Sequence, residues 1–388
     1  MSGDRRFWNA RLRAALRERN VVWLAGVRRA GKTTLARALS GAHYFDCELL
    51  RVRRQLEEPE AFFRRQGKAL VVLDEVHRLQ NPSEVLKIAA DHFPGVQLVA
   101  TGSSTLAAKN KFKDTLTGRK REVWLTPMIL DDLQDLGDTN LDRRMLHGGL
   151  PPMFLADTVD DYVYEEWMDS FWAKDLTELF VIEKKAAFFK FVELLFAQSG
   201  SLFEAQSFAA PCEISRPTVQ QYLSILETTL VAAVVRPYHA GAAAEIRSQP
   251  KVYAFDTGFV SYFKGIDRLR DDDRGMLLEH LVLNELLARY GAAHVYHWRD
   301  KQQHEVDFVL QAGRAKQPLA IECKASASKF NPAGMQAFRR RHPAGDNIVV
   351  TLRETERFEK TFGGVGVSFV PLTALPGALP ARGVSARL

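Results

Sequence analysis

Eight residues near the N-terminus have the spacing of a loop that binds phosphate. Gly26-Val27-Arg28-Arg29-Ala30-Gly31-Lys32-Thr33 fits G-x-x-x-x-G-K-[ST], between an apolar run at 21–25 and helix-forming residues from position 34. Backbone N–H groups of such a loop surround phosphate at the start of a helix. Lys32 would reach the β- and γ-phosphates of ATP, and the Thr33 hydroxyl would ligate Mg²⁺. The expected nucleotide contacts are Gly26, Arg29, Ala30, Gly31, Lys32, Thr33 and Thr34.

A second apolar run ends in two carboxylates. Residues 69–73 are followed directly by Asp74 and Glu75, as in a buried strand that delivers acids to a nucleotide site. Asp74 would hold Mg²⁺ through water, and Glu75 would polarise the attacking water as the general base. A chance glycine-rich turn would not come with such a strand, so the two motifs together predict ATP hydrolysis with Mg²⁺ as cofactor.

Two further groups fit the same reaction. An expected strand ends at Thr101-Gly102-Ser103-Ser104, where Thr101 or Ser103 would be a sensor that holds the lytic water; ordinary turn chemistry is the alternative. Arg119, directly after Thr117-Gly118, would bring positive charge to the γ-phosphate, in cis or in a neighbouring subunit's site. The alternative for Arg119 is a surface arginine.

A second set of charged residues lies in the C-terminal third. Glu279 falls in an expected helix, Asp307 in a strand, and Glu322 and Lys324 two apart on the next strand, where they share a face. Asp307 and Glu322 would ligate Mg²⁺, and Lys324 would position or deprotonate water against a phosphodiester. The alternative is a set of solvated or ion-paired charges on a fold that does not cut.

The order of apolar and amphipathic segments predicts which elements carry these residues. Between 21 and 129, short apolar runs alternate with helical stretches, which favours an α/β core with a parallel sheet. The expected strands are Val21–Ala25, His43–Phe45, Leu70–Asp74, Val96–Thr101 and Glu122–Leu125. Helical patterns follow at Tyr162–Leu179 and Lys185–Ala197, as in a helical lid.

The remaining chain divides into two further parts. Helical stretches at 202–209 and 217–227, the second capped by Ser215, and a β-rich run at 230–235 outline a winged helix-turn-helix. A helix at 276–290 and strands at 295–298, 305–310 and 319–323 predict a second α/β unit. The expected divisions are a basic N-terminal helix (1–20), an ATPase core (21–129), the lid (130–200), the winged-helix segment and linker (201–249), the second α/β domain (250–375) and a tail (376–388).

The net charge of +6 is unevenly distributed. Residues 1–20 hold six arginines against two acids, either as the solvated side of a helix whose apolar stripe is Phe7, Leu12 and Leu16, or as an arm that touches nucleic acid or a neighbouring subunit. Residues 275–345 hold ten basic against six acidic side chains, which favours a phosphate backbone. The winged-helix segment is slightly acidic, so its charge does not favour DNA. Its role could equally be a lid or subunit contact, or DNA contact through Arg216, Thr218, Gln220 and Gln221.

Several sequence blocks in one order resemble a known family. The blocks are GVRRAGKTT, LVVLDEVH, ATGSS, TGR before a Leu-Thr-Pro step, Gly148-Gly149-Leu150-Pro151 and KVYAFDTGF. Together they look like the prokaryotic AAA-type (AAA_14) ATPases with a C-terminal DUF4143 region. The resemblance covers about residues 21–370 and implies an AAA+-like P-loop core with helical lid, a winged-helix middle and a C-terminal α/β domain similar to the PD-(D/E)xK nuclease fold. AAA+ sites usually form between subunits, which implies a homo-oligomer, a ring included. Arg28 beside Arg29 departs from the family's loop.

Composition excludes several classes of protein. The longest apolar runs are far shorter than the roughly 20 residues of a membrane span, and the N-terminus lacks a signal peptide's apolar core. Three cysteines without C-x-x-C spacing fit reduced thiols and a cytoplasmic location. We expect an ATP-hydrolysing enzyme that binds and processes or remodels DNA, branched DNA included, with a metal-dependent nuclease as one form. The alternative is an ATP-dependent switch or scaffold that binds a protein partner.

Overall fold

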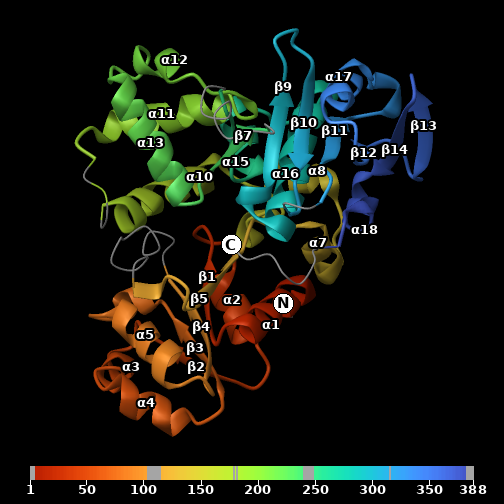
Figure 1. Cartoon of the computed structure of the whole chain (residues 1–388). Helices are drawn as coiled ribbons and strands as arrows, with labels where there is room; N and C mark the ends of the chain where they lie inside the picture. Colours follow the sequence, from red (N-terminus) through yellow and green to blue (C-terminus); the bar gives the residue numbers. More distant parts are fainter. Residues whose placement is uncertain are drawn as a thin grey trace. The chain divides into compact units, whose positions relative to one another are not determined.

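The computed structural model describes residues 5–102, 115–177, 180, 182–238, 249–313 and 316–381. The chain forms two compact units, each assembled from several segments (Figure 1). Unit 1 takes Met1–Thr139, Leu150–Glu183 and Thr228–Val231. Unit 2 takes Asn140–Gly149, Lys184–Glu227 and Ala232–Leu388.

Unit 1 is built on a parallel sheet of five strands in the order β2-β3-β4-β1-β5, which confirms the predicted α/β core. Its strands are β1 (Val21–Ala25), β2 (Ala42–Asp46), β3 (Leu70–Asp74), β4 (Gln97–Thr101) and β5 (Lys120–Trp124). Every residue of β1 is buried, because in a parallel sheet helices cover both faces of a central strand. All five expected strands are present, with boundaries that differ by two residues or fewer.

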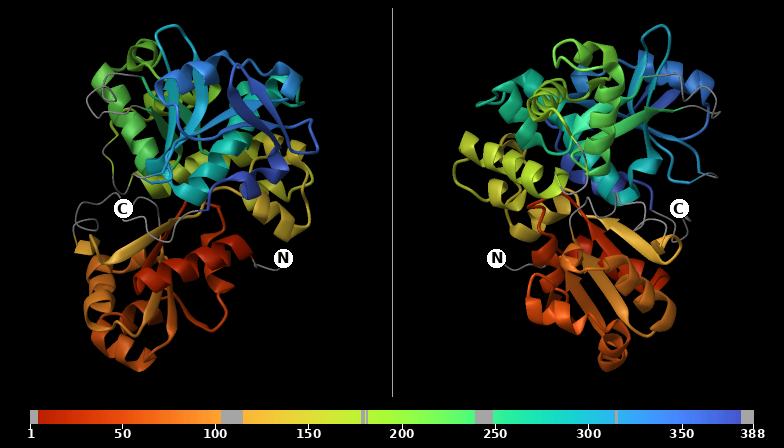
Figure 2. Two further views of the ribbon diagram at one scale, coloured as in Figure 1. Left: turned by 45° about the vertical axis from the view of Figure 1, so that its right-hand side comes forward. Right: turned by 90° about the vertical axis from the view of Figure 1, so that its left-hand side faces the viewer.

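Helices lie on both faces of this sheet, as Figure 2 shows. They are α1 (Arg6–Glu18), α2 (Lys32–Arg37), α3 (Leu50–Gln55), α4 (Pro59–Gln66), the short 3₁₀ helix η1 (Val76–Arg78) and α5 (Pro82–His92). On one face, alternate residues of β1 such as Trp23 pack with Phe62 and Phe63 of α4 and with Leu86 of α5. Burial of these large side chains supplies most of the stabilisation of unit 1.

Helix α1 is held against its own chain by contacts at its start. Trp8, Leu12 and Leu16 are the buried positions, so the expected stripe is shifted by one residue at its start, where Trp8 replaces Phe7. The helix is tied to α7 (Leu130–Leu136): Arg5 donates to both oxygens of Asp132, at 2.8 and 2.6 Å, and the Trp8 indole donates to Asp132 at 3.1 Å. These three hydrogen bonds to Asp132 favour a helix packed on its own chain over an arm that touches nucleic acid or a neighbouring subunit.

The helical part of unit 1 differs from expectation in one place. The sequence predicts a single helix at Tyr162–Leu179, but the α-helix α10 (Asp161–Phe171) gives way to a π-helical turn, Trp172–Leu176 (η3). A π turn inserts one residue into the helical repeat and rotates everything after it, and such turns are frequent at functional sites. The short α9 (Pro151–Phe154) precedes α10 in the same unit.

Unit 2 contains a nine-stranded mixed sheet in the order β13-β14-β12-β11-β10-β9-β7-β8-β6. Its strands are β6 (Ser201–Leu202), β7 (Ala232–Pro237), β8 (Lys251–Ala254), β9 (Val295–Arg299), β10 (Glu305–Leu310), β11 (Leu319–Lys324), β12 (Asn347–Thr351), β13 (Phe358–Phe362) and β14 (Val365–Pro371). Its α-helices are α8 (Leu141–Leu146), α11 (Lys185–Ala197), α12 (Ala205–Ala209), α13 (Arg216–Thr228), α15 (Thr257–Lys264), α16 (Asp271–Tyr290), α17 (Ala333–Arg341) and α18 (Leu375–Ala378). Strand β7 pairs with β9, so the segment with the winged-helix order of elements shares one sheet with the C-terminal strands.

Two blocks of the family resemblance meet inside unit 2. The buried Asp256 carboxylate accepts the backbone N–H of Gly149 at 2.6 Å and of Gly258 at 2.9 Å. Gly148 has φ of 87°, and a Cβ there would lie 1.9 Å from Asp256 Oδ1. Glycine is therefore required at this close approach, and the acid is a structural anchor. Burial raises the pKa of Asp256, although Arg144 and the backbone N–H groups oppose the shift.

Candidate nucleotide site and carboxylate cluster

The phosphate loop runs from the end of β1 to the start of α2. A Cβ at Gly26 would lie 2.6 Å from the Leu125 carbonyl oxygen, so only glycine permits this approach of β1 to the chain after β5. Gly31 has φ of 96° and is the N-cap of α2. Arg29 also has a positive φ, 65°, so the loop reverses sharply before the helix. The loop thus places the first backbone N–H groups of α2 at one edge of the sheet.

Lys32 lies within the loop that precedes it. Its ammonium donates to the carbonyl oxygens of Gly26, at 2.8 Å, and Val27, at 3.1 Å. Burial lowers the pKa of Lys32, while the Glu75 and Asp175 carboxylates oppose the shift. The ammonium is thus held by main-chain acceptors where phosphate oxygens would accept the same hydrogen bonds.

The two acids after β3 have different surroundings. Asp74 is buried and accepts hydrogen bonds from the Tyr44 hydroxyl, at 2.5 Å, and from the Thr101 hydroxyl. Glu75 has φ of 55°, and its carboxylate lies 3.0 Å from His77 Nδ1. Burial works to raise the pKa of Glu75, but the hydrogen bond and charge of His77, with the charges of Lys32 and Arg28, hold it below its usual value. Glu75 is therefore ionised at neutral pH, as a general base must be.

Of the two expected sensor residues, the structure places Thr101 beside the acids. The Thr101 hydroxyl donates to Asp74 and accepts the backbone N–H of Glu75 at 3.2 Å. The hydroxyl thus orients both acids. Ser103 lies outside the described residues.

Arg119 lies at the other edge of the sheet from the phosphate loop. It directly precedes β5, whereas the loop follows β1, and the two strands are parallel. Its guanidinium is 2.7 Å from Asp91 at the end of α5. The expectation that Arg119 acts on the same chain's γ-phosphate is therefore wrong, because parallel strands separate their starts from their ends. A role in a neighbour's site stays a prediction.

A pocket of about 580 Å³ opens at the phosphate loop. One wall comes from the loop and the start of α2, with Glu75 and His77, and a second from α10 and η3. The lining from α10 and η3 consists of Glu166, Ser170, Ala173, Lys174 and Asp175. The pocket is large enough for a nucleotide, since small-molecule sites range from about 300 to 1,000 Å³.

The oxygen donors at this pocket suit Mg²⁺. Thr33, at the start of α2, lines the pocket, and the Asp74 carboxylate is buried at the end of β3, directly before the lining residue Glu75. Mg²⁺ is held by one or two such oxygens together with phosphates and water, not by a cage of protein ligands. The described part of the chain contains no group of three or more His, Cys, Asp or Glu side chains that could hold a metal ion.

These features define a P-loop ATPase of the AAA type. The AAA domain model matches residues 18–133, a domain of unknown function (DUF8612) matches 138–270, and a second one (DUF4143) matches 274–375. The uncharacterized proteins Rv2008c of Mycobacterium tuberculosis and Mb2031c of Mycobacterium bovis are each 30% identical over 338 residues, 84% of this chain and 75% of theirs. The chain belongs to this family of AAA-type P-loop ATPases with a C-terminal DUF4143 domain.

Two solved structures resemble part of this chain at low sequence identity. The Walker-type ATPase PABY2304 of Pyrococcus abyssi is 14% identical, with a TM-score of 0.45 over 67% of this chain and 95% of that one. Cdc6p of Pyrobaculum aerophilum is 12% identical, with a TM-score of 0.28 over 67% of this chain and 94% of that one.

The structure brings the second set of charged residues together in unit 2. Strands β10 and β11 are antiparallel, which sets Asp307 beside Glu322. The Lys324 ammonium lies 2.8 Å from Glu322 and 3.6 Å from Asp307, and Asp307 also accepts the backbone N–H of Cys323 at 2.8 Å. Glu279 joins from α16, where it accepts the Tyr253 hydroxyl at 3.0 Å. All four residues expected here lie in one cluster.

The pKa values of the acids in this carboxylate cluster are shifted in different directions. Burial and the Asp307 charge raise the pKa of Glu322, and the same two causes raise that of Glu279 to about 7. Burial also works to raise the pKa of Asp307, but the charges of Lys324 and Lys251 hold it below its usual value. The cluster thus combines an ionised acid with acids that hold protons more tightly, a pattern that occurs at functional sites and in structural ion-pair networks alike.

Sequence reasoning missed two members of the cluster, Lys251 and Tyr253 of β8. The Lys251 side chain is 6% exposed, contacts Glu305 and lies 3.9 Å from Glu279. The only sequence signal was their spacing of two in a short β run, which places both side chains on one face. The cluster therefore contains two lysines.

Helix α13 carries the four residues expected to contact DNA. Arg216, Gln220 and Gln221 are exposed and Thr218 is partly exposed, while Val219 on the other side of the helix is buried. The Ser215 hydroxyl accepts the Thr218 backbone N–H at 3.3 Å, as expected for the cap of this helix. The four side chains are thus available to a partner, and no charge pattern selects DNA.

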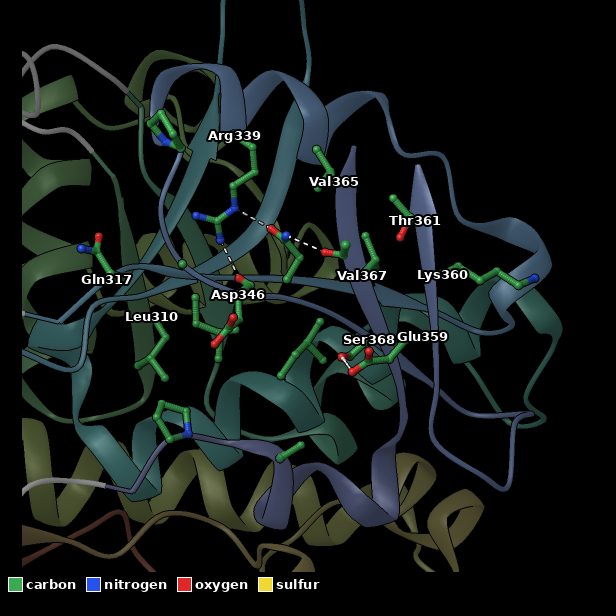
Figure 3. A pocket seen from close by; sticks show the side chains of 18 of the residues that line it. Leu310, Gln317, Arg339, Asp346, Glu359, Lys360, Thr361, Val365, Val367 and Ser368 are labelled. Atoms are coloured by element: carbon green, nitrogen blue, oxygen red, sulfur yellow. Dashed lines mark hydrogen bonds between the residues drawn. The ribbon is translucent and has the colours of Figure 1, made fainter. Parts of the chain in front are cut away.

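A separate cavity of about 790 Å³ in unit 2 lies against β12, β14 and α17 (Figure 3). Its most prominent cation is Arg339, which donates to Asn347 Oδ1 at 2.6 Å and to the carbonyl oxygens of Asp346 at 2.5 Å and Pro318 at 3.0 Å. Burial lowers the pKa of Arg339 to about 10. Because acceptors of the chain itself already bind this guanidinium, the cavity is a weaker candidate for an anion site than the phosphate loop.

In the described residues, no helix is both long and apolar enough to cross a bilayer.

Proposed function

We propose that this AAA-type protein hydrolyses ATP at the unit 1 pocket. Lys32 would bind the β- and γ-phosphates, Thr33 and Asp74 would hold Mg²⁺, and Glu75 would take the proton of the attacking water. When bound, Mg²⁺ supplies positive charge to the phosphates. Thr101 would keep Asp74 and Glu75 in position through its hydroxyl. The observation that carries the proposal is that Lys32 and an ionised Glu75 line one pocket, with Asp74 buried directly before Glu75.

Steady-state ATP turnover with Mg²⁺ tests this activity. We expect Lys32→Ala to abolish nucleotide binding, and Glu75→Gln to bind ATP but not to turn it over. Nucleotide binding that is unchanged in Lys32→Ala would overturn the assignment of the phosphate loop.

We further propose that hydrolysis is coupled to DNA bound by unit 2. The excess of basic side chains in residues 275–345 and the exposed polar side of α13 support this coupling. ATP turnover is to be compared without nucleic acid and with single-stranded, duplex and branched DNA, with Glu75→Gln as the control. Several-fold stimulation by one DNA form would support a DNA-processing or remodelling enzyme. Glu75-dependent turnover that ignores every DNA would favour the alternative, a nucleotide-dependent switch or scaffold that binds a protein.

The carboxylate cluster favours a second candidate activity, metal-dependent cleavage of DNA. Asp307 and Glu322 are hard oxygen ligands, and Lys324 lies within 4 Å of both, where it could act on water or phosphate. Under this hypothesis Lys324→Ala abolishes cleavage of plasmid DNA in Mg²⁺ or Mn²⁺ and leaves ATP turnover intact. The exposed Lys329, five residues along the chain, provides the matched control Lys329→Ala.

A further inference from the structure

The proposed mechanism gives Arg28 of the phosphate loop no role. Its guanidinium Nε lies 3.0 Å from Asp175 Oδ2, and its carbonyl oxygen accepts the Trp167 indole N–H at 3.1 Å. Both partners come from the α10 and η3 wall of the pocket. The loop is thus fastened to this wall through the side chain and the main chain of one residue.

The partner carboxylate belongs to the π-helical turn. Asp175 is fourth of the five residues Trp172–Leu176, and its side chain is 7% exposed. Without the extra residue of the π turn, residues after it would be rotated by about 100° around the helix. The turn therefore directs Asp175 into the nucleotide pocket, where it is a lining residue together with Arg28.

Arg28 lines the same pocket as Lys32 and Glu75. The Arg28 charge lowers the pKa of both Lys32 and Glu75, so it acts on the phosphate-binding lysine and on the expected general base. The Asp175 charge acts on Lys32 in the opposite direction. Arg29 differs: its side chain pairs at 2.7 Å with Glu166, whose side chain is 45% exposed.

We propose that Arg28 is an arginine, supplied in cis, that contacts the terminal phosphate of ATP, and that Asp175 holds it until ATP arrives. The proposal rests on ATP binding at this pocket. A guanidinium binds phosphate and carboxylate with the same two-donor geometry, so the phosphate can replace Asp175 as its partner. ADP lacks that phosphate and leaves the Arg28–Asp175 pair in place. ATP, unlike ADP, would therefore remove the side-chain contact between the loop and the α10 and η3 wall, while the main-chain contact with Trp167 remains.

Nucleotide binding by variants of the full-length protein tests the assignment. We expect Arg28→Gln to weaken ATP binding about tenfold or more and to change ADP binding less than about twofold, because only ATP loses a charge-assisted contact. Turnover should fall on the order of 10³-fold, as for other arginines that contact a γ-phosphate. Arg28→Lys, which keeps the charge but not the fork, should give intermediate values.

Asp175→Asn provides the reciprocal measurement. Removing a carboxylate that competes with phosphate should tighten ATP binding several-fold and change ADP binding less. Glu165→Gln, an acid-to-amide change at an exposed residue of the same α10, is the matched control and should leave the ATP to ADP ratio unchanged. Circular dichroism of each variant separates these effects from misfolding.

The outcomes distinguish this inference from the proposed function. If the wild-type protein hydrolyses ATP and Arg28→Gln keeps the wild-type ratio of ATP to ADP affinity, the Arg28 assignment is overturned and the ATPase proposal stands. An equal loss of both nucleotides in Arg28→Gln would likewise overturn it, since Arg28 would then serve only the shape of the loop. If the wild-type protein binds neither nucleotide, both proposals fall.

Discussion

The nucleotide pocket of unit 1 and the carboxylate cluster of unit 2 are made from the same kinds of side chain and use them differently. In the pocket, Lys32 donates to main-chain carbonyls and Asp74 accepts from two hydroxyls. In the cluster, Lys324 and Lys251 lie directly against carboxylates. A neutral hydrogen-bond partner can be exchanged for a ligand at lower cost than a buried opposite charge. Lys32 is therefore prepared for an anionic ligand, whereas a metal ion would have to displace the cluster's own ammonium groups.

The largest expected effect tests whether Glu75 takes part in ATP hydrolysis. Glu75→Gln should lower ATP turnover by roughly 10²- to 10⁴-fold, the usual contribution of a general base. ATP affinity and the urea midpoint of unfolding should remain close to wild type, because Glu75 is not a core residue. Glu57→Gln, at an exposed position of unit 1, serves as the control. If Glu75→Gln lost stability but kept its ATP turnover, Glu75 would be a structural acid and the pocket would not differ from the cluster in this respect.

In the cluster the expectation is reversed. Lys251→Met leaves the Glu305 and Glu279 carboxylates without their nearest ammonium group, and breaking a buried pair in this way should destabilise unit 2 by about 3 kcal/mol. ATP turnover should stay within about twofold of wild type. Urea denaturation followed by tryptophan fluorescence measures the loss, and Lys251→Arg should recover part of it. Full stability of Lys251→Met would show that the cluster's charges do not support the fold.

A buried histidine next to the cluster gives unit 2 a pH response of its own. Burial lowers the pKa of His280 to about 4, helped by the charges of Lys264 and Arg144 and opposed by a hydrogen bond to the Met276 carbonyl. The unfolded chain, with a pKa near 6.5, therefore binds the proton first, so the stability contributed by His280 falls as the pH falls from about 6.5 towards 4. Between pH 7.5 and 5.5 this contribution should fall by about 1.4 kcal/mol, while Glu279, whose pKa is raised to about 7, works in the opposite direction.

Unfolding of a His280→Gln variant checks the source of this response. The variant loses the neutral imidazole that lies 2.6 Å from the Ser199 hydroxyl, so it starts less stable, but its deficit relative to wild type should shrink by about 1.4 kcal/mol between pH 7.5 and 5.5. A deficit that is the same at both pH values would show that His280 contributes no pH dependence.

The smallest effect concerns the wall of the pocket. The Asp160 side chain caps α10 by accepting the Tyr162 backbone N–H at 3.2 Å. Asp160→Ala should destabilise unit 1 by about 1 kcal/mol, the usual cost of removing a cap. Asp161→Ala, one residue further on, lacks that capping role and should cost less. A cap that matters for ATP affinity as well as stability would link the α10 wall to nucleotide binding.

The sequence predicts those parts of the site that lie within short stretches of chain. The phosphate loop, the acids that end β3 and the five parallel strands each have a local pattern, and the period of two in strands brought Asp307, Glu322 and Lys324 to one face. Partners that come from distant segments have no such pattern. Arg28 and Asp175 are 147 positions apart, and the π turn that joins them follows an ordinary helical sequence.

The direction of a strand and its place in the sheet decide which residues reach a site. Arg119 is close in sequence to a strand of the nucleotide sheet, but only the topology shows that it precedes that strand and so lies at the far edge. Lys251 was visible as part of a family block, yet its burial among carboxylates depends on β8 sharing a sheet with β9 and β10, which begin about 45 to 55 residues later.

The strand order of unit 1 also determines how the protein must be made. The apolar strand β1 emerges first from the ribosome, but its neighbours in the sheet, β4 and β5, follow about 75 and 100 residues later. At roughly 5–20 residues per second, Val-Val-Trp-Leu-Ala stays unpaired for on the order of 5 to 20 seconds in each synthesis. Slowed translation, or shortage of chaperones, should therefore reduce the yield of this chain more than that of a protein whose first strand pairs with the second.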